Sequence, residues 1–204
     1  MEFNVTSEKI VESIFGKSRF ISIVFPVSDT EYFKKRLSRA QLEYPKATHY
    51  CYGYRIGIEE RAEDAGEPSR SAGYPILDLL VKKSLKDVAI IVIRYFHPPK
   101  LGLGPLTRAY RNAAKNVLDD ADLLEVFSFF SVKLKVNHDD YGQLVHYLTR
   151  LGKNVNYIDV HNESDDLGVV LFVHCYQDKT IIDEIYRLFN IIEATTSLEE
   201  GNSV

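Results

Sequence analysis

The sequence predicts an α+β protein of two domains, spanning residues 1–122 and 123–204. Apolar residues of the second part alternate between strand and helix spacing in the order β-α-β-β-α-β. The first part has one strand, 88–96, apolar enough to lie in the centre of a sheet, among amphipathic helical segments. The charge balance also changes: residues 1–124 contain 19 Lys and Arg against 16 Asp and Glu, and the rest contains 6 against 13. The two parts are therefore expected to present different surfaces.

In the first domain, apolar spacing and turn residues predict strands and helices in alternation. We expect strands at 19–27, 47–58 and 88–96, and helices at 28–44, 72–83 and 102–120. Ser28 is the expected N-cap of the first helix, and Pro45 ends that helix. The polar segment 59–71 is expected to be a loop, and roughly the first dozen residues are expected to be poorly ordered. The helices are expected to cover one face of the sheet.

The second domain shows the same two kinds of spacing. Strands are expected at 126–136, 154–160, 167–176 and 191–195, helices at 139–151 and 180–189, and a polar turn at 162–166. Gly152 is the expected C-cap of the first of these helices, and residues 198–204 are expected to be poorly ordered. This order of elements is the split βαβ or ferredoxin-like pattern.

Composition and motif tests exclude several classes of protein. The longest apolar run, 88–93, is far shorter than the roughly 20 residues of a membrane helix, and the N-terminus lacks the apolar core of a signal peptide. A cytoplasmic protein without a membrane partner is therefore expected. Cys51 and Cys175 lie far apart in apolar strands and are interpreted as buried hydrophobic residues. The six histidines lack metal-ligand spacing, and no dinucleotide or P-loop fingerprint is complete, so neither a metal nor a cofactor is expected.

The segment 94–110 is the most informative, because it leads from the buried strand through a tight corner into a helix. Free N–H groups in the first turn of a helix, together with the positive end of the helix dipole, favour an anion. Two glycines and four cations around this turn form a candidate anion or nucleic-acid site: Lys100, Gly102, Gly104, Arg108, Arg111 and Lys115. The alternative is that the cations only solvate an amphipathic helix and that the glycines only allow a tight turn.

A second group of residues forms a candidate pocket: His49, Asp64, Glu67, Arg94 and Tyr110. Asp64 and Glu67 directly precede a predicted helix and are candidates for paired acid and base carboxylates. The structural alternative is that these two acids balance the helix dipole or pair with Arg94 and Arg108. His49 shares one face of a strand with Cys51, but this spacing does not establish a catalytic pair.

Three motifs carry a resemblance to a known family. Residues 47–52 look like the strand motif A-T-H-x-C-x-A, residues 64–73 like the loop D-D-G-E-P-S-G-T-A-G, and residues 94–110 like the signature R-Y-F-G-G-x-K-L-G-x-G-G-L-x-R-A-Y. These motifs, in this order, resemble the N-terminal domain of the IMPACT family, as found in bacterial YigZ-like proteins. Residues 18–20 are also similar to that domain's opening strand, so the likeness covers roughly residues 15–120.

The resemblance implies a first domain with a ribosomal-protein and elongation-factor-G type sandwich, followed by a ferredoxin-like domain similar to the C-terminal part of elongation factor G. It also implies a role near translation, which the eukaryotic relatives influence through a protein partner. The chain departs from the family pattern where His97, Pro98 and Pro105 replace glycines, and where Ala65 and Arg70 replace an acid and a glycine. Each proline removes an N–H donor, so anion binding would depend more on side chains.

These observations favour a noncatalytic binding protein over an enzyme. The leading hypothesis is a translation-associated regulatory or nucleic-acid-binding protein, whose partner is RNA, the ribosome or a translation factor bound through the basic patch of the first domain. One alternative is an enzyme or sensor that binds a small anion such as a phosphate ester. The other alternative is a protein-interaction scaffold that docks through its acidic second domain.

Overall fold

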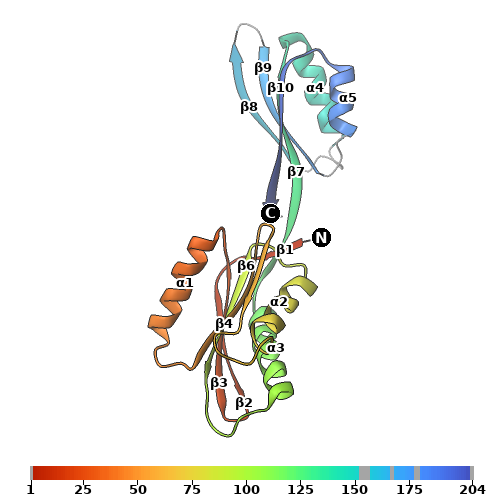
Figure 1. The fold of residues 1–204 in the computed structure, drawn as a ribbon. Helices are drawn as coiled ribbons and strands as arrows, with labels where there is room; N and C mark the ends of the chain where they lie inside the picture. Colours follow the sequence, from red (N-terminus) through yellow and green to blue (C-terminus); the bar gives the residue numbers. More distant parts are fainter. Residues whose placement is uncertain (1, 152–156, 166–167, 177–179, 203–204) are drawn as a thin grey trace. The chain divides into compact units, whose positions relative to one another are not determined.

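The computed structural model describes residues 2–151, 157–165, 168–176 and 180–202, which form an α+β protein with two sheets (Figure 1). The chain divides into two compact units, Met1–Val126 and Phe127–Val204. The predicted division after residue 122 lies just before β7 (Leu123–Val136), a strand that runs through the observed point of division. The start of β7 pairs with β1 (Glu2–Val5), which belongs to the first unit.

The sheet formed by β2 to β6 of the first unit is antiparallel and has the strand order β2-β3-β6-β4-β5. Its strands are β2 (Lys9–Phe15), β3 (Ser18–Pro26), β4 (His49–Ile56), β5 (Glu59–Glu63) and β6 (Val88–Tyr95). β6 is the middle strand, and every residue from Val88 to Arg94 is buried. The prediction of a central strand at this place is therefore confirmed.

Helices cover both faces of this sheet, so the prediction of one covered face is wrong (Figure 1). α1 (Thr30–Glu43) packs on one face, and α2 (Gly73–Lys82) and α3 (Leu103–Asp119) pack on the other. β3 shows the reason. Phe20 and Val24 belong to the core under α2 and α3, whereas Ile21 and Ile23 belong to the core under α1. Successive strand residues point to opposite faces, so a strand that is apolar throughout needs cover on both.

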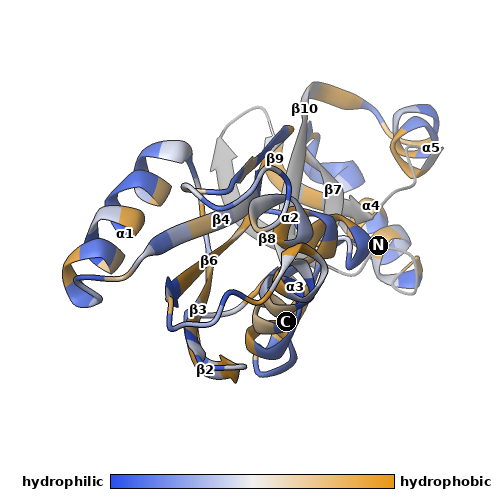
Figure 2. Cartoon of the chain, turned by 60° about the horizontal axis from the view of Figure 1, so that its bottom comes forward, coloured by the Kyte–Doolittle hydropathy of each residue, from blue (hydrophilic) through white to orange (hydrophobic). Residues whose placement is uncertain are grey.

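Hydropathy separates the layers of the first unit. Figure 2 shows β6 as hydrophobic along most of its length and hydrophilic residues over much of α1. Only Phe33, Arg36 and Ala40 of α1 are buried, and Arg36 is held by a double hydrogen bond to Glu8, with Nε–Oε2 and Nη2–Oε1 distances of 2.6 and 3.0 Å. α1 is thus anchored by a narrow apolar stripe and one largely buried cation.

Three further predictions for the first unit need correction. Residues 2–12 are ordered, because β1 pairs with β7 and β2 pairs with β3. Part of the expected loop 59–71 is the edge strand β5, whose mostly exposed residues hide its strand character. The N-cap of α1 is Asp29 and not Ser28, because the Asp29 carboxylate accepts the N–H of Tyr32 at 2.8 Å. This hydrogen bond and a second one from the Ser28 hydroxyl lower the pKa of Asp29. A carboxylate caps more strongly than a hydroxyl because the N–H groups meet a full charge.

The second unit has the predicted order β-α-β-β-α-β. After β7 come α4 (His138–Arg150), β8 (Tyr157–Asp165), β9 (Gly168–Tyr176), α5 (Thr180–Leu188) and β10 (Ile191–Asn202). The strand order is β10-β7-β9-β8, and the described pairs of β7 with β9 and of β8 with β9 are antiparallel. Its core contains alternate strand residues and the inner faces of both helices, among them Val132, Leu134, Leu144, Leu148, Leu171 and Ile182.

Two predictions for the second unit are also wrong. The polar turn expected at 162–166 is strand as far as Asp165, and residues 198–202 belong to β10. Polar segments of this kind lack the apolar alternation by which strands are recognised in a sequence. The expected C-cap Gly152 and the expected strand start at 154–156 lie outside the described residues. None of the described helices is long and apolar enough to cross a membrane.

Candidate functional site

The corner between β6 and α3 has the geometry that its glycines predict. Gly102 is the N-cap residue of α3 with φ +80°, a conformation that favours glycine, and its carbonyl accepts the N–H of Leu106 at 2.9 Å. No side chain caps the helix. The N–H groups of Leu103 and Gly104 lack intrahelical partners by the geometry of a first turn, whereas Pro105 has no N–H to offer.

The four cations of the predicted basic site fall into two pairs. Arg111 is bound by Asp78 on α2, with 2.6 Å between Nη2 and Oδ2, and Lys115 pairs with Asp119 one turn further along α3. Lys100 and Arg108 are exposed and have no hydrogen bond or ion pair with any described residue. Only two of the four cations are thus available to a ligand, because Asp78 of α2 and Asp119 of α3 neutralise the other two.

Beside this corner lies a pocket of about 550 Å³. Its polar lining comes from the start of β4, the loop before α2, the end of β6 and the corner: Thr48, His49, Glu67, Arg94 and Lys100. Its apolar lining consists of Pro68, Phe96, Leu101, Leu103 and Leu106, together with Gly66 and Gly102. This volume is in the range of small-molecule sites. We call it the Glu67 pocket.

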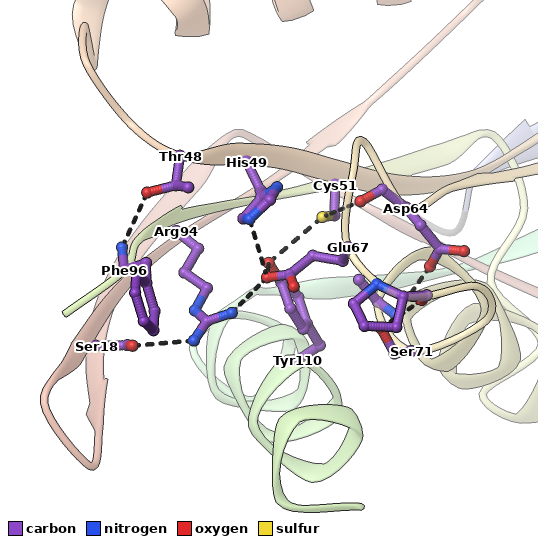
Figure 3. A network of polar contacts seen from close by, with 12 residues as sticks. Ser18, Thr48, His49, Cys51, Asp64, Glu67, Ser71, Arg94, Phe96 and Tyr110 are labelled. Atoms are coloured by element: carbon purple, nitrogen blue, oxygen red, sulfur yellow. Dashed lines mark hydrogen bonds and ion pairs between the residues drawn. The ribbon is translucent and has the colours of Figure 1, made fainter. Parts of the chain in front are cut away.

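A buried ion pair forms one wall of the Glu67 pocket (Figure 3). Glu67 Oε1 accepts Arg94 Nη1 at 2.6 Å and the hydroxyl of Tyr110 at 2.7 Å. Arg94 Nη2 donates to Ser18 Oγ at 3.1 Å, and the guanidinium lies beside the rings of Phe20 and Phe96. The register of the sheet brings these groups together, because His49 on β4 lies directly opposite Arg94 on β6.

Several polar atoms of this wall have no protein partner. Glu67 Oε2 makes no hydrogen bond with the described residues, although the side chain is only 5% exposed. Arg94 Nε is buried without a partner. The Nδ1 atom of His49 lies 2.9 Å from the carbonyl oxygen of Ala65, so Nδ1 carries the proton. In the neutral ring the acceptor is then Nε2, which lies 3.7 Å from Glu67 Oε1.

Asp64 has a structural position and does not line the Glu67 pocket. Its Oδ1 accepts the N–H groups of Ala72 and Gly73, both at 2.9 Å, and its Oδ2 accepts that of Arg70 at 2.6 Å. α2 has no capping side chain of its own, so Asp64 serves that purpose from the preceding loop. Arg70, which stands where the family pattern has glycine, adopts φ +60°, and this explains the preference for glycine there.

Cys51 and Tyr110 connect the Glu67 pocket to the core. The thiol of Cys51 lies 3.0 Å from the carbonyl oxygen of Asp64 and 3.4 Å from the Tyr110 hydroxyl, and both side chains are fully buried. Burial raises the pKa of Cys51 to about 12 and also raises that of Tyr110. Both groups are therefore neutral at physiological pH and act as hydrogen-bond donors. Cys51 is a buried free thiol, as predicted.

The structure brings five of the predicted residues to one pocket: His49, Glu67, Arg94, Lys100 and Gly102. Tyr110 contacts it from behind through Glu67, whereas Asp64, Gly104, Arg108, Arg111 and Lys115 do not line it. Sequence reasoning missed Phe96 and Leu103, although both lie within segment 94–110. It also missed the bond of Ser18 to Arg94, because residues that are 76 positions apart meet only through strand pairing. Among the described residues, no group of acids, histidines and cysteines could hold a metal ion.

The fold and the three motif segments define a protein built on an Impact N-terminal domain. The model of that domain matches residues 16–118, so the chain belongs to the IMPACT family. It is 38% identical over 117 residues to the IMPACT family member YvyE of Bacillus subtilis, covering 56% of this chain and 54% of YvyE. It is 31% identical to YigZ of Escherichia coli, covering 53% and 55%. The matches span about half the length of these two relatives.

Two further comparisons extend beyond the first unit. An IMPACT family member of Thermus thermophilus is 37% identical, with 67% of this chain and 74% of the relative covered. A crystal structure of a hypothetical protein superimposes with a TM-score of 0.58 at 20% identity and covers 97% of both chains. At this identity the superposition shows a shared fold.

Proposed function

We propose that this chain is a nucleic-acid-binding protein associated with translation, and that the N-terminal unit holds a phosphate of RNA at the α3 corner. The observation that carries the proposal is that Lys100 and Arg108, before and after the start of α3, have no partner among the described residues. A phosphate there would meet two free positive charges and the open N–H groups of the first helical turn.

The second unit supports the same class of protein. Its strand order β10-β7-β9-β8 and its element order favour a ferredoxin-like domain, and we propose that it follows a ribosomal-protein and elongation-factor-G type domain in the first unit. We propose RNA or the ribosome as the partner, met in the cytoplasm. The resemblance to elongation factor G is a resemblance of folds, so the functional argument depends on the cations at the α3 corner.

The test compares the two cations at the start of α3 that have no partner among the described residues with the two cations of α3 that acids neutralise. We would measure binding of a labelled single-stranded ribosomal RNA fragment by fluorescence anisotropy from 50 to 200 mM salt. The double variant Lys100→Ala/Arg108→Ala should lose at least tenfold in affinity. Its slope of log K against log salt should fall by about 0.7, since the two cations hold one phosphate and each phosphate contact to a single strand contributes about 0.7.

The matched control is Arg111→Ala/Lys115→Ala, which removes the same charge from α3. Because Asp78 and Asp119 already neutralise these two cations, the control should bind RNA within about threefold of the parent protein. Equal losses in both double variants would show that only net charge matters, and unchanged binding in the first would remove the α3 corner from the proposal.

A second candidate is an enzyme or sensor for a small phosphate ester. It is favoured by one observation, the acceptor Nε2 of His49 beside a cavity that also contains Lys100. Turnover in a phosphatase or nuclease screen that is lost in His49→Ala but kept in Lys34→Ala, a change on the opposite face of the sheet, would favour this candidate over a binding protein.

A further inference from the structure

The interior of the Glu67 pocket differs in character from its rim. On the interior wall, Glu67 Oε2 and His49 Nε2, the ring nitrogen opposite the one bonded to Ala65, have no donor among the described residues. At the rim are a free ammonium group, Lys100, and the open start of α3. A ligand that satisfies both must offer N–H or O–H donors at one end and a negative charge at the other.

The rest of the pocket is apolar and partly aromatic. Phe96 is half-buried and lines the pocket, together with leucines of the corner and first turn of α3. A flat ring packed on this surface would leave little unpaired polar area, whereas a flexible polar chain would lose hydration without compensation. The ligand is thus expected to be planar and apolar in its middle.

We propose that the Glu67 pocket takes one unstacked nucleotide, with the base inside and the phosphate at Lys100. A guanine base fits the interior best, because its Watson–Crick edge presents two neighbouring donors, N1–H and the N2 amino group, to the Glu67 carboxylate and His49 Nε2. Glu67 and Arg94 compensate each other's charge, whereas Lys100 has no partner among the described residues, so the phosphate is expected at the rim.

This inference rests on the proposed function, since it names the ligand of the same site. The same chemistry is offered by free guanosine monophosphate and by a guanosine nucleotide at the 5′ end of an RNA. The pocket volume of about 550 Å³ is suited to one nucleotide, so the remaining nucleotides of an RNA would lie outside, within reach of Arg108.

The experiment is calorimetric titration of the full chain with guanosine monophosphate, adenosine monophosphate, guanosine and inorganic phosphate. Guanosine monophosphate should bind at least tenfold more tightly than each of the other three. It alone offers donors to Glu67 and His49, a ring to the apolar lining and a phosphate to Lys100. Lys100→Ala should lower the affinity for guanosine monophosphate at least tenfold and change the affinity for guanosine by less than twofold. Lys34→Ala, which removes an equally free cation from α1, should change neither.

Two interior variants test the position of the base. Phe96→Ala should weaken guanosine monophosphate and guanosine alike, by at least fivefold, since base stacking does not depend on the phosphate. Glu67→Gln should abolish the preference for guanine over adenine; where that variant fails to fold, His49→Ala replaces it, because His49 is bonded to the protein through a single ring nitrogen.

The outcomes separate this inference from the proposed function. In one outcome, an RNA with a 5′-phosphorylated guanosine binds tightly and depends on Lys100 and Arg108, while guanosine monophosphate does not bind and Phe96→Ala has no effect. This outcome would overturn the pocket inference and leave the RNA proposal intact. Binding of guanosine monophosphate without binding of RNA would instead support the pocket and overturn the RNA proposal. Equal binding of all four probes, or none, overturns the pocket inference.

Discussion

Glu67 and Arg94 form an ion pair in which each side chain is only 5% exposed, with 2.6 Å between Oε1 and Nη1. Loop 64–72 and strand β6 are joined through it, and Tyr110 of α3 donates to the same carboxylate oxygen. The pair therefore ties three parts of the first unit together at the pocket wall. Burying charges costs free energy, so a buried ion pair at this place favours a ligand-binding role for the pocket wall over a purely structural one.

Removing one partner of this pair should be strongly destabilising. In Glu67→Ala, the Arg94 guanidinium stays buried without a counterion, and we expect a loss of about 3–5 kcal/mol in the free energy of unfolding. Urea denaturation followed by circular dichroism measures it. Asp119→Ala removes an exposed partner of Lys115 and should cost less than about 1 kcal/mol. Similar losses in both variants would contradict a buried, coupled pair.

Asp64 is expected to hold its loop and α2 together through hydrogen bonds, with no part in ligand binding. Asp64→Ala leaves three backbone N–H groups without their acceptor, those of Arg70, Ala72 and Gly73, and should cost about 2–4 kcal/mol. Asp64→Asn keeps an acceptor at Oδ1 and should cost about 1 kcal/mol. Thermal unfolding distinguishes the two. Intact stability in Asp64→Ala would show that water replaces the carboxylate.

Two glycines of the family motifs should respond in opposite ways to alanine. A Cβ atom on Gly73 would lie within 2.7 Å of the carbonyl carbon and oxygen of Glu63, so Gly73→Ala should cost about 1–3 kcal/mol. A Cβ atom on Gly104 would meet only the end of the Arg108 side chain at 3.6 Å. Gly104→Ala should be neutral or stabilise by up to about 1 kcal/mol, since alanine favours helix. Chemical denaturation of both variants tests the contrast.

The raised pKa of Cys51 gives a pH dependence of stability. Burial raises this pKa from 9.0 to about 12, so the unfolded chain loses a proton that the folded chain keeps. The contribution of Cys51 to the free energy of unfolding is fully present below about pH 9 and is lost as the pH rises towards 12. From pH 9 to pH 10 the parent protein should lose about 1 kcal/mol more than Cys51→Ala. Parallel pH profiles would mean that Cys51 already ionises in the folded protein.

The sequence alone determined the order and kind of the regular elements that are apolar. β6, α3 and the alternating elements of the second unit follow from spacing, because burial of one face or of both imposes a period on the chain. Membership of the IMPACT family also follows from the sequence, through the motifs at 47–52, 64–73 and 94–110. The edge strand β5, whose residues are mostly charged and exposed, carries no such period, and strand pairing alone decides it.

Only the tertiary structure decided which candidate residues meet. The four cations between Lys100 and Lys115 look alike in the sequence, which gives no sign that Asp78 and Asp119 neutralise Arg111 and Lys115 while Lys100 has no partner among the described residues. Likewise, Asp64 and Glu67 look equivalent in the sequence, yet one caps a helix and the other lines a pocket. The physical reason is that pairing of charges depends on distances of a few ångströms between segments far apart in the chain, and strand register and helix packing set those distances.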